Sequence, residues 1–291
     1  MFRCPDSDNT IKKCELTMVK IISWNIARRK EPWRTLIDTD ADIALLQEAT
    51  EPPDDIGGKI EVNHAPWETI GADKTRPWRT AIVKLSDRVD VKWHEAKPLS
   101  EANTGEFGVS RLGTLAAATV TPSSGEPFVI VSMYAMWERP HADTGSSWIV
   151  ADASVHRLIS DLSVFVGQQN KHRIIAAGDL NILFGYGEDG SAYWGNRYST
   201  TFDRMAAIGI PFVGPQAPAG RRANPWPDEL PQTSNNVPTY HSNFMTPATA
   251  IRQLDFVFAS NSIAEQVNVR ALNEPDQWGP SDHCRVEIDV E

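Results

Sequence analysis

Four short apolar runs, spread from one end of the chain to the other, are bounded by polar residues. They cover residues 19–22, 43–46, 174–177 and 254–259. Runs of this length and composition are typical of strands buried inside a sheet. The chain is therefore expected to build its core on strands that are far apart in the sequence.

Polar side chains stand where these strands end. Carboxylates, amides and one imidazole follow the first three runs directly and the fourth at some distance, as Asn25, Glu48, Asp179, Asn181, Asp282 and His283. Rigid strands deliver such groups to one rim of a sheet with little positional freedom. A rim that carries these groups is typical of a divalent-metal hydrolase site.

Further strand signals fill the middle and the end of the chain, at residues 80–84, 89–93, 112–121, 127–134 and 286–290. The turn residues Ser123-Ser124-Gly125 predict a hairpin between two of these strands. Strands dominate and helices lie between some of them. This order predicts an α/β fold in which two mixed β-sheets pack face to face and are flanked by helices.

Helical spacing of apolar residues is clearest over residues 148–166. A short helix is expected after residue 31, where Pro32 suits the first turn. Thr200 or Thr201 is placed to cap a third helix that ends at Gly209.

The chain is long enough for a sizeable core, with 291 residues of which 41% are hydrophobic. No linker divides it, so we predict a single domain over residues 18–291. Residues 1–17 are charged and lack an apolar run, which predicts a poorly ordered extension rather than a signal peptide. Residues 214–238, rich in proline and polar residues, are expected to form a long surface excursion.

The net charge of −10 argues against a broad basic face that follows the phosphates of a duplex. A small or locally held phosphate-bearing substrate is still compatible, because a bound metal would neutralise part of this charge. Three cysteines without CxxC spacing indicate neither a disulfide framework nor structural zinc, so the cytoplasm is the expected compartment. We expect no membrane insertion and find no sign of an obligate protein partner.

Five motifs in a fixed order give the chain a resemblance to the endonuclease/exonuclease/phosphatase superfamily. They are Trp24-Asn25, Gln47-Glu48, Gly178-Asp179-Leu180-Asn181, Leu254-Asp255-Phe256-Val257-Phe258 and Ser281-Asp282-His283. Each motif alone is weak, and the ordered set is what distinguishes the pattern from chance. The resemblance implies a four-layer α/β/β/α sandwich of the DNase I-like fold. It also implies Mg²⁺-dependent cleavage of a phosphate ester, with Mn²⁺ as a possible substitute.

Within this resemblance, Glu48 is expected to be the principal metal ligand, supported by Asn25 and Asp282. Asp179 and Asn181 would converge on one water, with the carboxylate accepting its proton. The ordinary alternatives are a solvated glutamate at a strand end and turns closed by Asx hydrogen bonds.

His283 would donate a hydrogen bond or a proton to the phosphoryl oxygens, and Asp255 would orient its imidazole. Tyr134 matches the position from which the family contacts the scissile phosphate, although a tyrosine that closes a strand is more often a packing residue.

Substrate contacts are less strongly indicated. Arg28, Arg29 and Arg79 lie near the motif strands and could hold outer phosphates, whereas most charged residues in loops are simply solvated. Tyr193 and Trp194 belong to residues 185–198, the best candidate for a loop that shapes the substrate site.

The motifs do not name the substrate. Ala27 stands where many DNA-repair members carry an acid, and Ala135-Met136-Trp137-Glu138 replaces their usual sequence after the Tyr134 strand. We therefore expect a nuclease acting on single-stranded, end-exposed or small nucleotide substrates. A phosphatase or phosphodiesterase for a lipid head group or small organophosphate is the alternative. A catalytically silent binding module with the same fold is a third.

Overall fold

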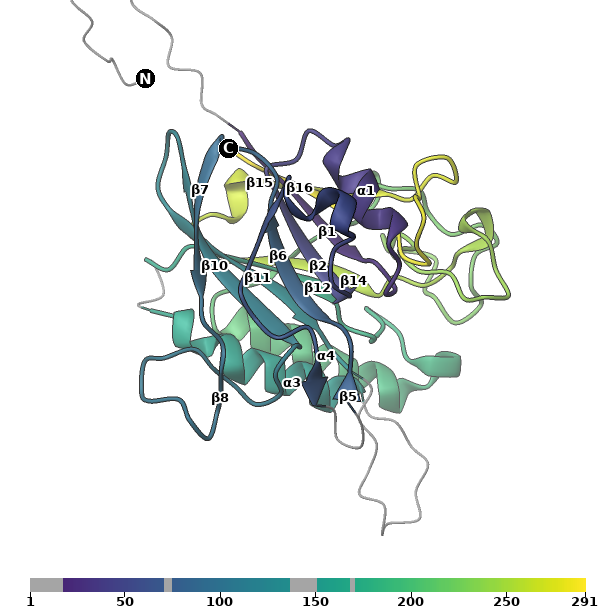
Figure 1. Cartoon of the computed structure of the whole chain (residues 1–291). Coiled ribbons are helices and arrows are strands. Elements are labelled where there is room, and N and C mark those ends of the chain that lie inside the picture. The colour runs from purple at the N-terminus through teal and green to yellow at the C-terminus, as the bar shows by residue number, and fades with distance from the viewer. Residues whose placement is uncertain (1–17, 71–74, 137–150, 168–170) are drawn as a thin grey trace, which may run out of the picture.

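The computed structural model describes residues 18–70, 75–136, 151–167 and 171–291. The predicted extension over residues 1–17 lies outside these ranges. Two six-stranded mixed sheets form the centre of the molecule (Figure 1). The first sheet has the strand order β15 (Val267–Leu272), β16 (Arg285–Val290), β1 (Val19–Asn25), β2 (Ile43–Ala49), β6 (Arg79–Lys84) and β3 (Glu61–Val62). The second has the order β13 (Phe212–Gly214), β14 (Asp255–Ala259), β12 (Ile174–Asp179), β11 (Phe128–Tyr134), β10 (Leu115–Pro122) and β7 (Val89–His94).

Helices cover the outer faces of the two sheets. They are α1 (Glu31–Ile37), α2 (Asp54–Gly57), α3 (Ala151–Leu162) and α4 (Ala192–Ala207). Single 3₁₀ turns span Ser163–Phe165, Glu188–Gly190, Pro247–Thr249 and Ala264–Gln266. Two small ribbons pair β4 (Thr69–Ile70) with β5 (Thr75–Arg76) and β8 (Lys97–Pro98) with β9 (Gly108–Val109). None of the described helices is long and apolar enough to cross a bilayer.

Three hydrophobic clusters fill the spaces between the layers. One lies between the sheets and contains Ile21, Leu45 and Ile130. A second cluster joins the sheet that contains β12 to α3 and α4. A third joins the sheet that contains β1 to α1 through Trp24 and Trp33. The predicted four-layer α/β/β/α sandwich is therefore confirmed, and the long strands supply both faces of the central cluster.

Strand register brings the ends of distant strands to one rim. β1 and β2 run parallel and pair Asn25 with Gln47, so both end at the same edge. In the other sheet β11 and β12 are parallel and pair Tyr134 with Asp179. β14 runs antiparallel to β12, which places its first residue, Asp255, directly opposite Asp179. The rim that the strand-end motifs predict is thus created by the pairing itself.

Some expected elements are confirmed by the structure and others differ from it. The predicted hairpin is confirmed, since β10 and β11 pair in antiparallel register. The third helix begins at Ala192 rather than near residue 200, so Thr201 is a buried residue inside it instead of its cap. Residues 215–239 form neither helix nor strand. Yet this segment buries Val237 and Leu230 against neighbouring clusters, so it is more than a solvated excursion.

Candidate active site

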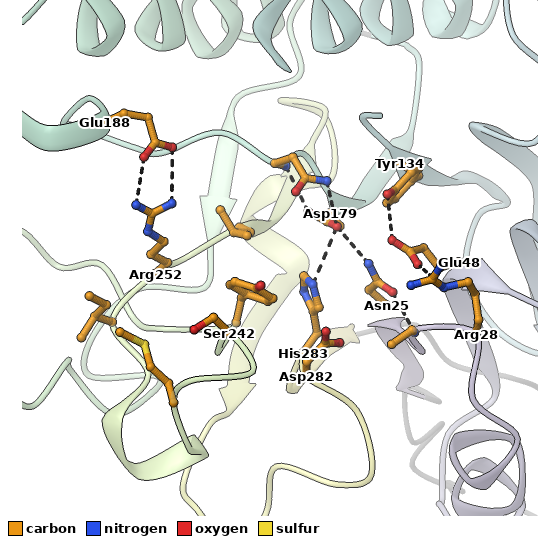
Figure 2. A pocket seen from close by; sticks show the side chains of 16 residues that line it. Asn25, Arg28, Glu48, Tyr134, Asp179, Glu188, Ser242, Arg252, Asp282 and His283 are labelled. Carbon is orange, nitrogen blue, oxygen red and sulfur yellow. Dashed lines mark hydrogen bonds and ion pairs between the residues drawn. The ribbon is translucent and has the colours of Figure 1, made fainter. Parts of the chain in front are cut away.

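A cavity of about 650 Å³ opens at the rim where the strand ends meet (Figure 2). Eight of the residues that the sequence predicts as functional line it: Asn25, Arg28, Glu48, Tyr134, Asp179, Asn181, Asp282 and His283. Asp255 lies directly behind His283 and is hydrogen bonded to it. The two sheets contribute to the same cavity, with Asn25 and Glu48 from one sheet and Tyr134 and Asp179 from the other.

Asp179 is the centre of a buried hydrogen-bond network. One carboxylate oxygen accepts hydrogen bonds from the side-chain amides of Asn25 at 2.9 Å and Asn181 at 3.1 Å. The other accepts the backbone N–H of Asn181 at 3.0 Å. Burial raises the pKa of Asp179 to about 7, while the nearby positive charge of His283 acts in the opposite direction. The carboxylate is therefore held in one orientation and is poised to exchange a proton near neutral pH.

His283 lies between two carboxylates. Its Nδ1 is 2.8 Å from Asp255 Oδ2, and its Nε2 is 3.8 Å from Asp179 Oδ2. Burial of the imidazole lowers its pKa, but Asp255 and Asp179 outweigh that effect and raise the pKa of His283 to about 10. The imidazole is consequently protonated at neutral pH, with Nδ1–H directed at Asp255 and Nε2–H on the side of Asp179.

Glu48 stands across the cavity from this pair. Its Oε1 accepts the phenolic O–H of Tyr134 at 2.8 Å, and its Oε2 lies 3.0 Å from Arg28 Nε. Burial and the adjacent carboxylate raise the pKa of Tyr134, so the phenol stays protonated and donates this bond. Glu48 is therefore fixed by two partners while its side chain stays partly exposed to the cavity.

Unusual backbone geometry is concentrated at this cavity. Five non-glycine residues of the described chain have a positive φ, and Ala27, Arg28, Glu48 and Asn181 line the cavity. Such conformations cost about 1–3 kcal/mol each and are kept where surrounding structure enforces them. Gly178, at φ 154°, has no room for a side chain, because a Cβ there would lie 1.9 Å from the Met133 carbonyl oxygen.

Supporting hydrogen bonds tie the site to both sheets. Ser281 Oγ donates to the Asn25 carbonyl at 2.7 Å, and Trp24 Nε1 donates to the His283 carbonyl at 2.9 Å. Thr239 Oγ1 accepts the backbone N–H of Asp255 at 3.1 Å. The first two bonds link β1 to the His283 segment, and the third holds the first residue of β14.

The far wall of the cavity comes mostly from residues outside the five sequence motifs. An ion pair joins Arg252 Nη2 to Glu188 Oε2 at 2.9 Å (Figure 2). Apolar side chains of Met245, Ile251 and Leu254 also line this wall. Tyr240 also lines the cavity and packs on His283 with 4.9 Å between ring centroids. Apart from Leu254, no sequence signal identifies this wall, because its other residues lie outside the long strands.

Four of the predicted substrate-binding residues are placed elsewhere. Arg79 is 2% exposed, donates to Asn63 and lies over the Trp67 ring, so its guanidinium is committed to the interior. Arg29 is exposed and donates to the Pro280 carbonyl. Tyr193 and Trp194 lie in the first turn of α4 rather than in a loop and do not line the cavity.

The donor set suits a hard divalent cation. Four carboxylates but only three cationic groups line the cavity, so the lining leaves room for an additional positive charge. Within the described residues, no three His, Cys, Asp or Glu side chains converge closely enough to hold a metal by themselves. Mg²⁺ commonly takes one or two carboxylates and completes its shell with water and substrate oxygens. Glu48 keeps free lone pairs on both oxygens and fits that role.

Known structures with a similar architecture were found, whereas no family model and no curated protein sequence matches the chain. The endonuclease domain of TRAS1, a telomere-specific non-LTR retrotransposon, aligns with 94% of this chain and 98% of its own, with a TM-score of 0.59 and 15% identity. The AP endonuclease LMAP from Leishmania major aligns with 99% of this chain and 93% of its own, with a TM-score of 0.59 and 14% identity. TDP2 from D. rerio, in a complex with a single-stranded DNA product, aligns with 94% of this chain and 99% of its own, with a TM-score of 0.52 and 14% identity.

The chain has the DNase I-like fold. At identities near 15%, the likeness establishes the architecture and leaves the chemistry to the chain's own residues. In this DNase I-like sandwich the cavity lies at the rim where strands of both sheets end.

Replacing Asp255 with asparagine is expected to lower kcat/KM by about 10- to 100-fold, as loss of a supporting carboxylate commonly does. The variant also removes the charge that raises the pKa of His283. The pKa of His283 therefore falls in the variant. As the pH is raised, the variant should lose its protonated imidazole, and with it the activity, at a lower pH than the wild type. The measurement is kcat/KM across neutral and alkaline pH.

Asp42→Asn is the matched control, because Asp42 is also a buried carboxylate paired with a cation, Arg88, outside the cavity. Its pH profile should follow that of the parent. An unshifted alkaline limb in Asp255→Asn would show that Asp255 does not set the charge of His283.

Proposed function

We propose that the protein is a divalent-metal-dependent phosphodiesterase, and that its substrates are nucleic acids or nucleotide-like phosphodiesters. The observation that carries this proposal is the meeting of Asp179, His283 and Glu48 around one cavity, each held by its own partner. A buried acid able to accept a proton, an imidazolium able to donate one and a partly exposed carboxylate together suit phosphate-ester hydrolysis.

The chain's own residues then have separable tasks. Asp179 orients a water and accepts its proton, and the raised pKa of Asp179 makes that transfer favourable near neutral pH. Asn25 and Asn181 keep the carboxylate aligned through their amide hydrogen bonds. His283 directs its Nε2–H at the phosphoryl oxygens, where negative charge accumulates as the bond to the leaving group breaks.

Glu48, with support from Asn25 and Asp282, is proposed to hold the metal ion. Bound Mg²⁺ or Mn²⁺ would neutralise phosphate charge and polarise the phosphorus centre. Tyr134 fixes the Glu48 carboxylate through its O–H. Arg28 pairs with the same carboxylate and compensates part of its charge, which is a different role from holding an outer phosphate.

Turnover is expected to require added Mg²⁺ or Mn²⁺ and to disappear with EDTA. The test is a panel of single- and double-stranded DNA, RNA, abasic DNA, sphingomyelin and bis-p-nitrophenyl phosphate. Activity on the nucleic acids with either ion, and none with EDTA, supports the proposal. Undiminished turnover in EDTA contradicts it.

The same panel separates the other two candidates. Turnover confined to sphingomyelin or bis-p-nitrophenyl phosphate favours an enzyme for lipid head groups or small organophosphates, which the net charge of −10 also suits. Metal binding without turnover on any phosphodiester favours a silent binding module.

A further inference from the structure

Phe244 is the most exposed large hydrophobic side chain of the described residues, at 99% of its full accessible surface. The others are Met18, Leu99, Val164 and Tyr193. Only Phe244 is adjacent in sequence to a residue that lines the cavity, namely Met245. Isolated exposed hydrophobic residues are ordinary, so the position of Phe244 in a segment that lines the cavity is what distinguishes it.

The segment that carries Phe244, residues 241–246, is here called the rim loop. Ser242 and Met245 on either side of Phe244 both line the cavity. The His241 N–H donates to the Asp282 carbonyl at 3.0 Å, one residue from His283. At the other end, Thr246 and Thr249 form a capping box. The rim loop therefore carries an exposed aromatic ring on a segment whose neighbouring residues line the cavity.

Because its backbone is held in this way, the loop loses little additional backbone entropy on binding. The Met245 N–H bonds to the Ser242 carbonyl at 2.9 Å, which closes a turn around Phe244. Arg221 Nη2 donates to the Pro247 carbonyl at 2.8 Å and anchors the following 3₁₀ turn. An exposed aromatic ring on a loop that lines the cavity suits stacking on a flat ligand group.

Charge and shape favour an unpaired nucleobase as that group. The chain carries a net charge of −10, which argues against binding a phosphate backbone through broad electrostatic attraction. Stacking on a base does not depend on a basic surface and is open to every base. The bases of a duplex are already stacked on each other, whereas those of a single strand are free to stack on an added ring.

We propose that Phe244 is a specificity-determining residue that stacks on an unpaired base beside the scissile phosphate, and that it thereby directs the protein to single-stranded nucleic acid. The inference rests on the proposed function, since it assumes that a nucleic-acid phosphate occupies the cavity. It adds the strandedness of the substrate, which the groups that carry out the chemistry do not determine.

The test measures binding rather than turnover. All variants are made in an Asp179→Asn background, which is expected to bind without cleaving. The dissociation constant is measured by fluorescence anisotropy with a short labelled single strand, as DNA and as RNA, and with a blunt hairpin duplex. Phe244→Ala is expected to weaken single-strand binding by about 5- to 150-fold, the range for loss of one stacked base. Its effect on the duplex should be smaller.

Two further substitutions distinguish stacking from general apolar contact. Phe244→Trp should keep the single-strand affinity, while Phe244→Leu, apolar but without a π face, should lose it as Phe244→Ala does. Leu99→Ala is the matched control, because Leu99 is 59% exposed and lies outside the cavity. It should bind like the parent.

Several results would overturn the inference. These are no measurable single-strand binding by the parent, unchanged affinity in Phe244→Ala, or full affinity in Phe244→Leu. A different pattern would assign the ring to a lipid surface instead. In that pattern the parent sediments with phosphatidylcholine and phosphatidylserine vesicles, and Phe244→Ala abolishes the sedimentation but leaves the single-strand affinity unchanged. Absence of turnover with every divalent ion refutes the proposed function, and that result comes from a separate measurement on the wild-type chain.

Discussion

Asp179→Asn is expected to lower turnover by at least about 100-fold while the fold persists, because asparagine cannot accept a proton from water at neutral pH. Asp179 is fully buried and accepts three hydrogen bonds from Asn25 and Asn181. The asparagine carbonyl can keep some of these bonds, so the side chain should hold its place. Steady-state kinetics with Mg²⁺ and near-UV circular dichroism measure the two effects separately.

Asp161→Asn supplies the control for Asp179→Asn. Asp161 is also a buried carboxylate whose pKa is raised by burial, and it accepts hydrogen bonds from Ser110, but it lies on α3 outside the cavity. Turnover by this variant should match the wild type. If Asp179→Asn is as active as Asp161→Asn, then Asp179 does not activate the water.

Strand-end residues were predictable because register leaves them little freedom. Once apolar runs are recognised as strands, the parallel pairing of β1 with β2 and of β11 with β12 brings their last residues to one edge. Asp255 follows from the antiparallel pairing of β14 with β12. The four-layer arrangement follows from the same runs, since strands that are apolar on both faces require cover on both sides.

The residues between strands were less predictable. Arg79 opens a strand, and only the structure shows its guanidinium turned inward to Asn63 and Trp67. Tyr193 is predicted in a loop because its segment directly follows the Asp179–Asn181 turn, whereas the structure places it in the first turn of α4. The Glu188–Arg252 pair joins two segments 64 residues apart, a contact that single-sequence periodicity does not report.

The cavity consists of two unlike halves. Its strand-end half holds the groups suited to chemistry on a phosphate, with positions set by the sheets. Its other half, built from the rim loop and the Glu188–Arg252 wall, belongs to loops and 3₁₀ turns. Loops on a rigid scaffold usually set specificity. The proposed reaction and the proposed substrate preference are therefore separable by mutation.

Glu48→Gln is expected to weaken Mg²⁺ binding by at least about 10-fold and to remove most turnover, because the principal anionic ligand is lost. Glutamine can still accept the Tyr134 O–H, so the buried phenol keeps its partner and the fold should persist. Isothermal titration with Mg²⁺ and Mn²⁺ measures the affinity. Glu106→Gln, which breaks a comparable pair with Lys97 outside the cavity, should bind metal like the wild type.

Arg28 offers a way to distinguish a metal ligand from a structural ion pair at Glu48. Its guanidinium lies 3.0 Å from Oε2 and competes with a cation for that oxygen. If Glu48 is the ligand, Arg28→Ala should tighten Mg²⁺ binding, whereas Arg28→Ala in a Glu48→Gln background should not. If Glu48 serves only to pair with Arg28, neither variant changes metal affinity. The two substitutions then remove the same ion pair, so together they lower the thermal stability no more than either one alone. That second pattern would remove Glu48 from the proposed metal site.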